Sequence, residues 1–87
     1  MEALNFAIMK YLDSVEEDCV NGVIEAMKAK GYGSWKQLKF ASVQETLKTA
    51  VANGLVDESR FDLDEDNQLR VYYKMNDYGS GMVHKFL

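Results

Sequence analysis

The hydrophobic periodicity of this chain changes once, near Gly54, and that change constrains the fold more than any other feature. Before this glycine, apolar residues recur at spacings of three and four, which places them on one side of a helix. After it, apolar and polar residues alternate over residues 61–63 and 69–75, as they do in strands that bury one face. The sequence therefore predicts a helical body followed by an antiparallel hairpin, with the turn at residues 64–68.

Three helices are predicted before the hairpin, and the first of them covers residues 3–12. Ser14 and Glu17 have the spacing of a capping box, in which each side chain satisfies a free backbone N–H at a helix start. A second helix is therefore expected from Val15. Gly31 follows two lysines and is expected to end that helix in the left-handed conformation.

The third helix is expected over residues 43–53, because Ser42 and Glu45 repeat the capping-box spacing and Gly54 follows as a stop. Asn76 is expected to cap a short closing helix. Three apolar residues of this helix are expected to fold back onto the core: Met82, Val83 and Phe86. Three aromatic residues between the second and third helices are also expected in the core: Tyr32, Trp35 and Phe40.

With 87 residues, the chain is expected to form one domain, residues 1–87, around one core. No run approaches the roughly 18 apolar residues that a membrane span needs, and the start of the chain lacks the signal-peptide pattern. We therefore expect no membrane partner. Cys19 is the only cysteine, which is typical of a reducing compartment, so a cytoplasmic protein is expected.

Charge is divided between two parts of the chain, although the net charge is −4. Residues 28–48 contain five lysines and one glutamate, whereas residues 57–66 contain six acids and one arginine. The folded chain is therefore expected to be electrically polarised, with the predicted hairpin as its negative end.

Three segments resemble the winged helix–turn–helix pattern of the PadR and MarR repressor families. Residues 42–47 resemble the start of a recognition helix, residues 50–56 its end, and residues 71–76 the returning wing strand with the cap of the next helix. The resemblance covers residues 42 to 80 and implies an α+β fold with a three-helix core, a two-stranded antiparallel wing and a short C-terminal helix. The lead helix of the motif is either residues 15–30, followed by a long turn, or a shortened helix over residues 35–39.

The resemblance implies a small stand-alone transcriptional regulator that inserts the third helix into the major groove of double-stranded DNA. The expected DNA contacts are Lys36, Lys39, Ser42, Gln44, Glu45, Lys48 and Thr49. The lysines would neutralise phosphates, while glutamine can bond adenine and a carboxylate can accept from cytosine. The alternative for these residues is a solvated helix face.

The acidic turn of the predicted wing favours a different function, because carboxylates repel phosphates. In this alternative the chain is a protein-interaction module or a DNA mimic that does not bind DNA. A basic protein partner would then contact Asp62, Asp64, Glu65 and Asp66. A third interpretation is an acidic loop that only keeps an exposed sheet edge soluble. The pattern predicts no oligomeric state.

The sequence predicts no enzyme, no cofactor and no metal. Alternate carboxylates from Asp62 onward resemble the start of an EF-hand loop, but its sixth position is Asn67 and its twelfth is Tyr73, where glycine and glutamate are required. Cys19 and His84 are isolated, and no phosphate-binding loop or catalytic triad is present.

Overall fold

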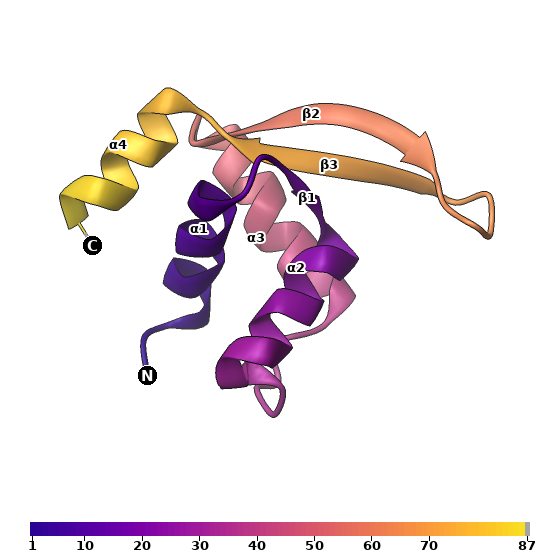
Figure 1. The fold of residues 1–87 in the computed structure, drawn as a ribbon, viewed down its shortest axis with the longest axis horizontal. Helices are drawn as coiled ribbons and strands as arrows, with labels where there is room; N and C mark the ends of the chain where they lie inside the picture. The colour runs from indigo at the N-terminus through magenta and orange to yellow at the C-terminus, as the bar shows by residue number, and fades with distance from the viewer. Residues whose placement is uncertain (87) are drawn as a thin grey trace.

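Three helices pack against one face of an antiparallel sheet, and a long hairpin of that sheet projects beyond them (Figure 1). The structure is a computed structural model and describes residues 1–86. In chain order the elements are α1 (Leu4–Ser14), β1 (Asp18–Cys19), α2 (Val20–Met27), the π-helical segment η1 (Lys28–Tyr32), α3 (Phe40–Ala52), β2 (Val56–Leu63), β3 (Leu69–Met75) and α4 (Asp77–Phe86). The sheet order is β1-β3-β2, so β3 is the middle strand of an α+β fold.

The core lies between the three helices and the inner face of the sheet. Its fully buried side chains come from every one of these helices and from β2 and β3: Ile8, Leu12, Val23, Met27, Val43, Leu47, Val56 and Tyr73. The helical spacing seen in the sequence therefore marks the buried faces correctly for α1, α2 and α3. No helix among residues 1–86 is long and apolar enough to cross a membrane.

The predicted stop after α3 is confirmed at Gly54, which has a φ of 78°. The N–H of Gly54 donates to the carbonyl of Val51 at 3.0 Å, and the N–H of Leu55 donates to that of Ala50 at 3.0 Å. This pair of bonds is a Schellman motif, which satisfies two carbonyls at the helix end and favours glycine at the left-handed position. It turns the chain directly from α3 into β2.

Asn76 joins the two ends of the hairpin to α4. Its Nδ2 donates to the carbonyl of Gly54 at 2.8 Å, and its Oδ1 accepts from the N–H of Gly79 at 2.8 Å. The second bond confirms the predicted N-cap of α4. One side chain therefore connects the end of α3, the end of β3 and the start of α4.

The predicted start of the second helix at Val15 is wrong, because the chain first forms a third strand. Asp18 and Cys19 pair antiparallel with β3, and α2 begins only at Val20. Glu17 does not cap a helix: its carboxylate accepts from the hydroxyl of Ser59 at 2.9 Å and pairs with Arg60. The predicted two-stranded sheet therefore has three strands within the described residues.

The third helix begins at Phe40, three residues before its predicted start, so Ser42 and Glu45 lie inside it. The N-cap residue is Lys39, and no side chain bonds to the free N–H groups there. Residues 35–39 form turns, not a shortened helix, which leaves α2 as the helix that precedes α3.

Two of the aromatic residues predicted to pack in the core are exposed. Tyr32 is buried and meets Trp35 edge-on with 4.7 Å between ring centroids, as expected. Phe40, however, is 49% exposed, because its position on α3 faces the space beneath the hairpin and not the core. Phe86 is 64% exposed, because the last turn of α4 lies at the rim of an apolar groove described below.

Gly79 offers the sharpest test of the packing of α4. A Cβ at this position would lie 2.1 Å from the carbonyl oxygen of Leu55 and 2.4 Å from the sulfur of Met75. We expect Gly79→Ala to lower the free energy of unfolding by about 1–3 kcal/mol, because the backbone or the core must shift. Urea denaturation measures this change.

Gly81 is the matched control, since it lies in the same helix and a Cβ there meets nothing within 4 Å. We expect Gly81→Ala to be neutral or to stabilise the protein by up to about 1 kcal/mol. Equal effects of the two substitutions would contradict the packing described here.

Candidate functional site

The outward ridge of α3 carries little charge. Four residues at spacings of three and four form it, and all four are exposed: Ala41, Glu45, Lys48 and Ala52. The ridge thus presents one acid, one base and two small side chains, which leave its backbone accessible.

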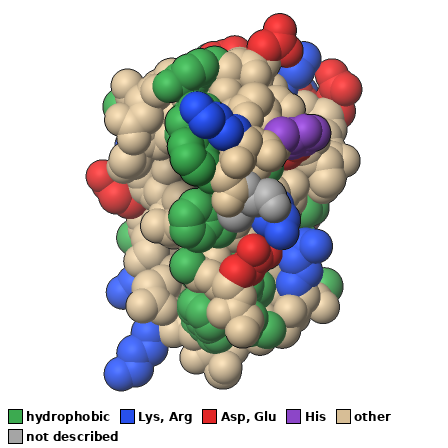
Figure 2. Space-filling model, turned by 90° about the vertical axis from the view of Figure 1, so that its left-hand side faces the viewer, with side chains coloured by type: hydrophobic (Ala, Val, Ile, Leu, Met, Phe, Trp, Pro, Cys, Tyr) green, Lys and Arg blue, Asp and Glu red, His purple; other side chains and the backbone are tan. Residues whose placement is uncertain are grey.

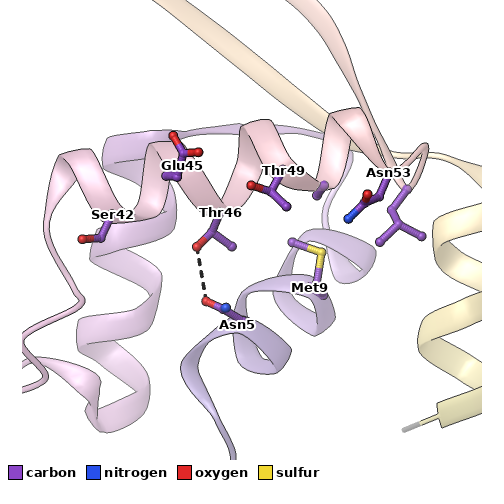
Figure 3. Close-up of a pocket in the computed structure, with 9 residues that line it drawn as sticks. Asn5, Met9, Ser42, Glu45, Thr46, Thr49 and Asn53 are labelled. Carbon is purple, nitrogen blue, oxygen red and sulfur yellow. Dashed lines mark hydrogen bonds between the residues drawn. The ribbon is translucent and has the colours of Figure 1, made fainter.

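The structure separates the residues predicted to read DNA. Glu45 and Lys48 lie on the ridge, whereas Gln44 is partly buried beneath the hairpin. Ser42 and Thr49, together with Glu45, line a cleft of about 480 Å³ between α3 and α1. Figure 3 shows this cleft, in which the hydroxyl of Thr46 donates to Oδ1 of Asn5 at 3.2 Å.

Three exposed lysines lie in α3 or in the loop that precedes it. Lys36 and Lys39 are exposed in the loop before α3, and Lys48 lies about 12 Å along the helix from Phe40 at 1.5 Å per residue. Within residues 1–86 none of these three ammonium groups forms an ion pair, whereas Lys28 pairs with Glu25 at 3.3 Å. Lys36 and Lys39 therefore lie before the start of α3 and Lys48 lies in its second half, and none of the three charges is neutralised by an ion pair within residues 1–86.

The outer face of the hairpin is a connected polar network. Arg70 donates to both carboxylate oxygens of Asp62, at 2.7 and 2.9 Å, and the hydroxyl of Tyr72 donates to Asp62 at 3.4 Å. The guanidinium of Arg60 lies 3.7 Å from the centre of the Tyr72 ring and pairs with Glu17. This network ties the hairpin to the segment before β1.

The network lowers the pKa of two carboxyl groups. Hydrogen bonds from Arg70, aided by the charges of Arg70 and Arg60, hold the pKa of Asp62 below its ordinary value of 3.8. The hydrogen bond from Arg60 has the same effect on the pKa of Glu17. Asp62, which was predicted to contact a protein partner, is therefore already paired inside the chain.

The four acids predicted to bind a partner have two different roles. Oδ1 of Asp64 accepts from the N–H groups of Asp66 and Gln68, both at 2.9 Å, and so shapes the turn. Asn67 has a φ of 60°, as expected for an asparagine in such a loop. Glu65 and Asp66 are exposed, and within residues 1–86 their carboxylates have no cationic partner.

An apolar groove between α1 and α4 is a surface that sequence reasoning missed. Its volume is about 540 Å³, and it is lined by Phe6, Met9, Leu55, Met75, Gly79, Met82, Val83 and Phe86. Figure 2 shows hydrophobic side chains gathered in a band on this side of the molecule. The available signal was the position of Phe6 and Met9 on α1, beside the buried stripe and not within it.

Metal ligands do not gather among the described residues: no group of three or more histidine, cysteine, aspartate or glutamate side chains could hold an ion there. His84 lines a separate hollow with Lys10, Asp13 and Val83, and its Nε2 lies 2.9 Å from Oδ2 of Asp13.

No protein-family model and no curated protein sequence matches the chain. Its fold is similar to a crystal structure titled as a "putative transcriptional regulator" from Thermoplasma acidophilum, with a TM-score of 0.72 and 20% identity. The similarity covers 94% of this chain and 74% of the other. At this identity the likeness shows the fold alone, an α+β fold with a three-stranded antiparallel sheet.

The outer network makes a pH-dependent contribution to hairpin order. The pKa of Asp62 is lowered in the folded chain, so the ionised carboxylate stabilises the folded hairpin. This stabilisation is fully present above pH 3.8 and is lost as the pH falls through the lowered pKa. We expect amide protection factors in β2 and β3, measured by hydrogen exchange, to fall over this range before those of α3.

Asp62→Asn should reduce the amide protection factors of β2 and β3 near neutral pH. A smaller pH dependence of these factors should remain, because the pKa of Glu17 is lowered as well. Asp66→Asn is the control, since the Asp66 carboxylate contacts no cation among residues 1–86. Hairpin protection that is the same in Asp62→Asn and the parent protein would show that the network does not order the hairpin.

Proposed function

We propose that this chain is a winged-helix protein of the PadR/MarR type that binds double-stranded DNA and regulates transcription. In this proposal α2 and α3 form the helix–turn–helix, α3 is the recognition helix, and the β2–β3 hairpin is the wing. Support comes from the order of the elements and from a similar fold in a protein described as a "putative transcriptional regulator".

The observation that carries the proposal is the set of three unpaired lysines at α3. Lys36, Lys39 and Lys48 can each neutralise a phosphate, and the uncapped N–H groups at the start of α3 favour an anion as well. The small side chains of Ala41 and Ala52 allow the helix to approach the floor of the major groove. Glu45 is then the side chain of the ridge that reaches a base edge.

The remaining predicted contacts have secondary roles. Ser42 and Thr49 lie at the α1 side of α3, where hydroxyl groups can bond one strand of the DNA backbone. Gln44 lies on the hairpin side of α3. The carboxylates of the acidic turn would repel phosphates, so in this proposal the wing contributes no contact to DNA.

Binding to mixed-sequence duplex DNA should depend steeply on salt. Three phosphate contacts predict a slope of about −2.7 for log affinity against log salt, at about 0.9 per contact. We expect Lys48→Glu to weaken binding about ten-fold at 0.1 M salt and to reduce the slope by about 1. Fluorescence anisotropy of a labelled duplex measures both quantities.

Lys85→Glu provides a control with the same charge change on α4, away from α3, and should leave the slope unchanged. If no duplex is retained even at low salt, the DNA-binding proposal is lost.

We further propose that two copies bind together through the apolar groove between α1 and α4. Phe6 and Phe86 are 52% and 64% exposed at the rims of a groove with an apolar lining. A two-fold arrangement can place the rim phenylalanines of each copy in the groove of the other, which makes the surface self-complementary. DNA-binding dimers of this kind read two half-sites.

We expect the double substitution Phe6→Ser with Phe86→Ser to weaken self-association at least ten-fold in sedimentation equilibrium, because both rim side chains are removed. Phe61→Ser on the hairpin is the control and should have no effect. A parent protein that stays monomeric up to millimolar concentration would refute the paired arrangement.

A second candidate function concerns the hairpin: the wing binds a basic protein partner, or imitates the charge of nucleic acid. The observation that favours it is the pair of exposed carboxylates, Glu65 and Asp66, that lack a cationic partner within residues 1–86. Asp62 and Asp64 would support this surface by holding the turn in shape.

A further inference from the structure

The two faces of the hairpin differ in chemistry. Directly paired residues of an antiparallel ribbon lie on the same face, and Phe61 pairs with Val71 while Leu63 pairs with Leu69. Val71 lies two residues from the buried Tyr73, so this is the inner face, which continues from the core. The outer face carries the network of Asp62, Arg70 and Tyr72.

The inner face stays uncovered beyond the core. Phe61, Leu63 and Leu69 are 58%, 60% and 67% exposed. A hollow of about 400 Å³ lies beneath β3. It is bounded on the hairpin by Leu69 and Val71, with Asp64 and with Arg70, which is paired to Asp62, and on the other side by residues at the starts of α2 and α3. Phe40 reaches into this hollow from α3, which adds a fourth exposed apolar side chain to the surface.

Acidic groups stand at both ends of this apolar surface. Glu65 and Asp66 lie in the turn beyond Leu63 and Leu69. At the other end lies Glu58, which pairs directly with the buried Tyr73 and therefore lies on the inner face. A bulge at Ser59 shifts the alternation by one residue, so that Phe61 lies on the same face as Glu58. Glu58 is exposed and, like the two acids of the turn, has no cationic partner within residues 1–86.

The hollow also offers neutral hydrogen-bonding groups. The side chains of Asn21, Gln44 and Gln68 line it, and within residues 1–86 none of their amide groups forms a hydrogen bond. Such groups can bond the backbone of a bound chain without adding charge.

We propose that the inner face of the hairpin binds a peptide segment of a partner protein, with apolar side chains in the middle and lysine or arginine at both ends. The apolar side chains would cover Phe61, Leu63 and Leu69, and the cations would meet Glu58 at one end and Glu65 with Asp66 at the other. This inference rests on the second candidate function, protein binding by the wing, and does not depend on DNA binding by α3.

Charge and composition argue against two other occupants. DNA would place phosphates against three unpaired carboxylates. A second copy would have to supply its own basic segment, residues 28–39, in which Tyr32 is buried in the core and Trp35 and Leu38 are partly buried against it. An apolar peptide with basic ends matches both properties of the surface.

The test uses the full-length ¹⁵N-labelled protein and three synthetic peptides of equal length. The first has a central run of alternating leucine and alanine with two lysines at each end, the second has glutamates in place of the lysines, and the third has serines in place of the leucines. We expect only the first to shift the amide signals of β2, β3 and the start of α3, at micromolar concentration.

Two variants identify the face that binds. Leu63→Ser with Leu69→Ser should weaken binding of the first peptide at least ten-fold, and these exposed positions leave the fold intact, as signal dispersion would verify. Glu58→Gln with Glu65→Gln and Asp66→Asn should remove the salt dependence of binding. Tyr78→Ser on α4, at a side chain that is 60% exposed, is the control and should bind like the parent protein.

Each other outcome overturns the inference. If the serine peptide binds as well as the first peptide, the hairpin recognises charge alone. The second candidate function would then survive, and the inference of an apolar contact would fail. Binding of none of the peptides would refute both. Shifts of the inner face on adding duplex DNA, or on raising the protein concentration alone, would assign the surface to DNA or to a second copy.

Discussion

The junction between Gly54 and Asn76 is the constraint on which the rest of the structure depends. The Schellman motif at the end of α3 sends the chain into β2 at one fixed angle, and Asn76 returns β3 to the same point before α4 begins. The hairpin is thus anchored at both of its ends to the C-terminal end of α3. Its far end projects beyond the helices (Figure 1), and Asp64 and Gln68 at that end share a hollow with Phe40 at the start of α3.

The lysines and the unpaired acids lie on different elements of this arrangement. The lysines lie in the loop before α3 and on the helix itself, whereas the unpaired acids lie on the hairpin. The outer face of the hairpin satisfies its charges internally through Asp62, Arg70 and Glu17, which leaves the inner face and the turn for contacts with other molecules. In the functions proposed above, one small fold therefore presents the lysines in and before α3 to DNA and the acidic, apolar hairpin to a protein.

Local patterns predicted the elements that depend on neighbouring residues. Helical spacing identified the buried faces of α1, α2 and α3, the Asn-Gly pair marked the end of α3, and alternation identified both long strands. The Ser14 and Glu17 pattern failed because the Glu17 carboxylate pairs with Ser59 and Arg60, more than forty residues away. A two-residue strand such as β1 is too short to leave a periodic signal.

The candidate sites were predictable only in part, because burial is a property of the assembled fold. The sequence located the lysines and the acids, but it could not reveal that Asp62 and Asp64 are occupied within the hairpin. Phe61 and Leu63 alternate with polar residues, as side chains on the buried face of a strand do. They are nevertheless exposed, because the hairpin extends beyond the core at their positions. The groove between α1 and α4 was hidden for the same reason.

The central claim is that α3 and the hairpin meet different partners, and a chemical-shift map of the ¹⁵N-labelled protein on addition of duplex DNA tests it most directly. The account predicts that the shifted amide signals cluster at residues 36–39 and along α3, with those of residues 58–69 unchanged. Shifts concentrated in the hairpin turn, or none at α3, would contradict it.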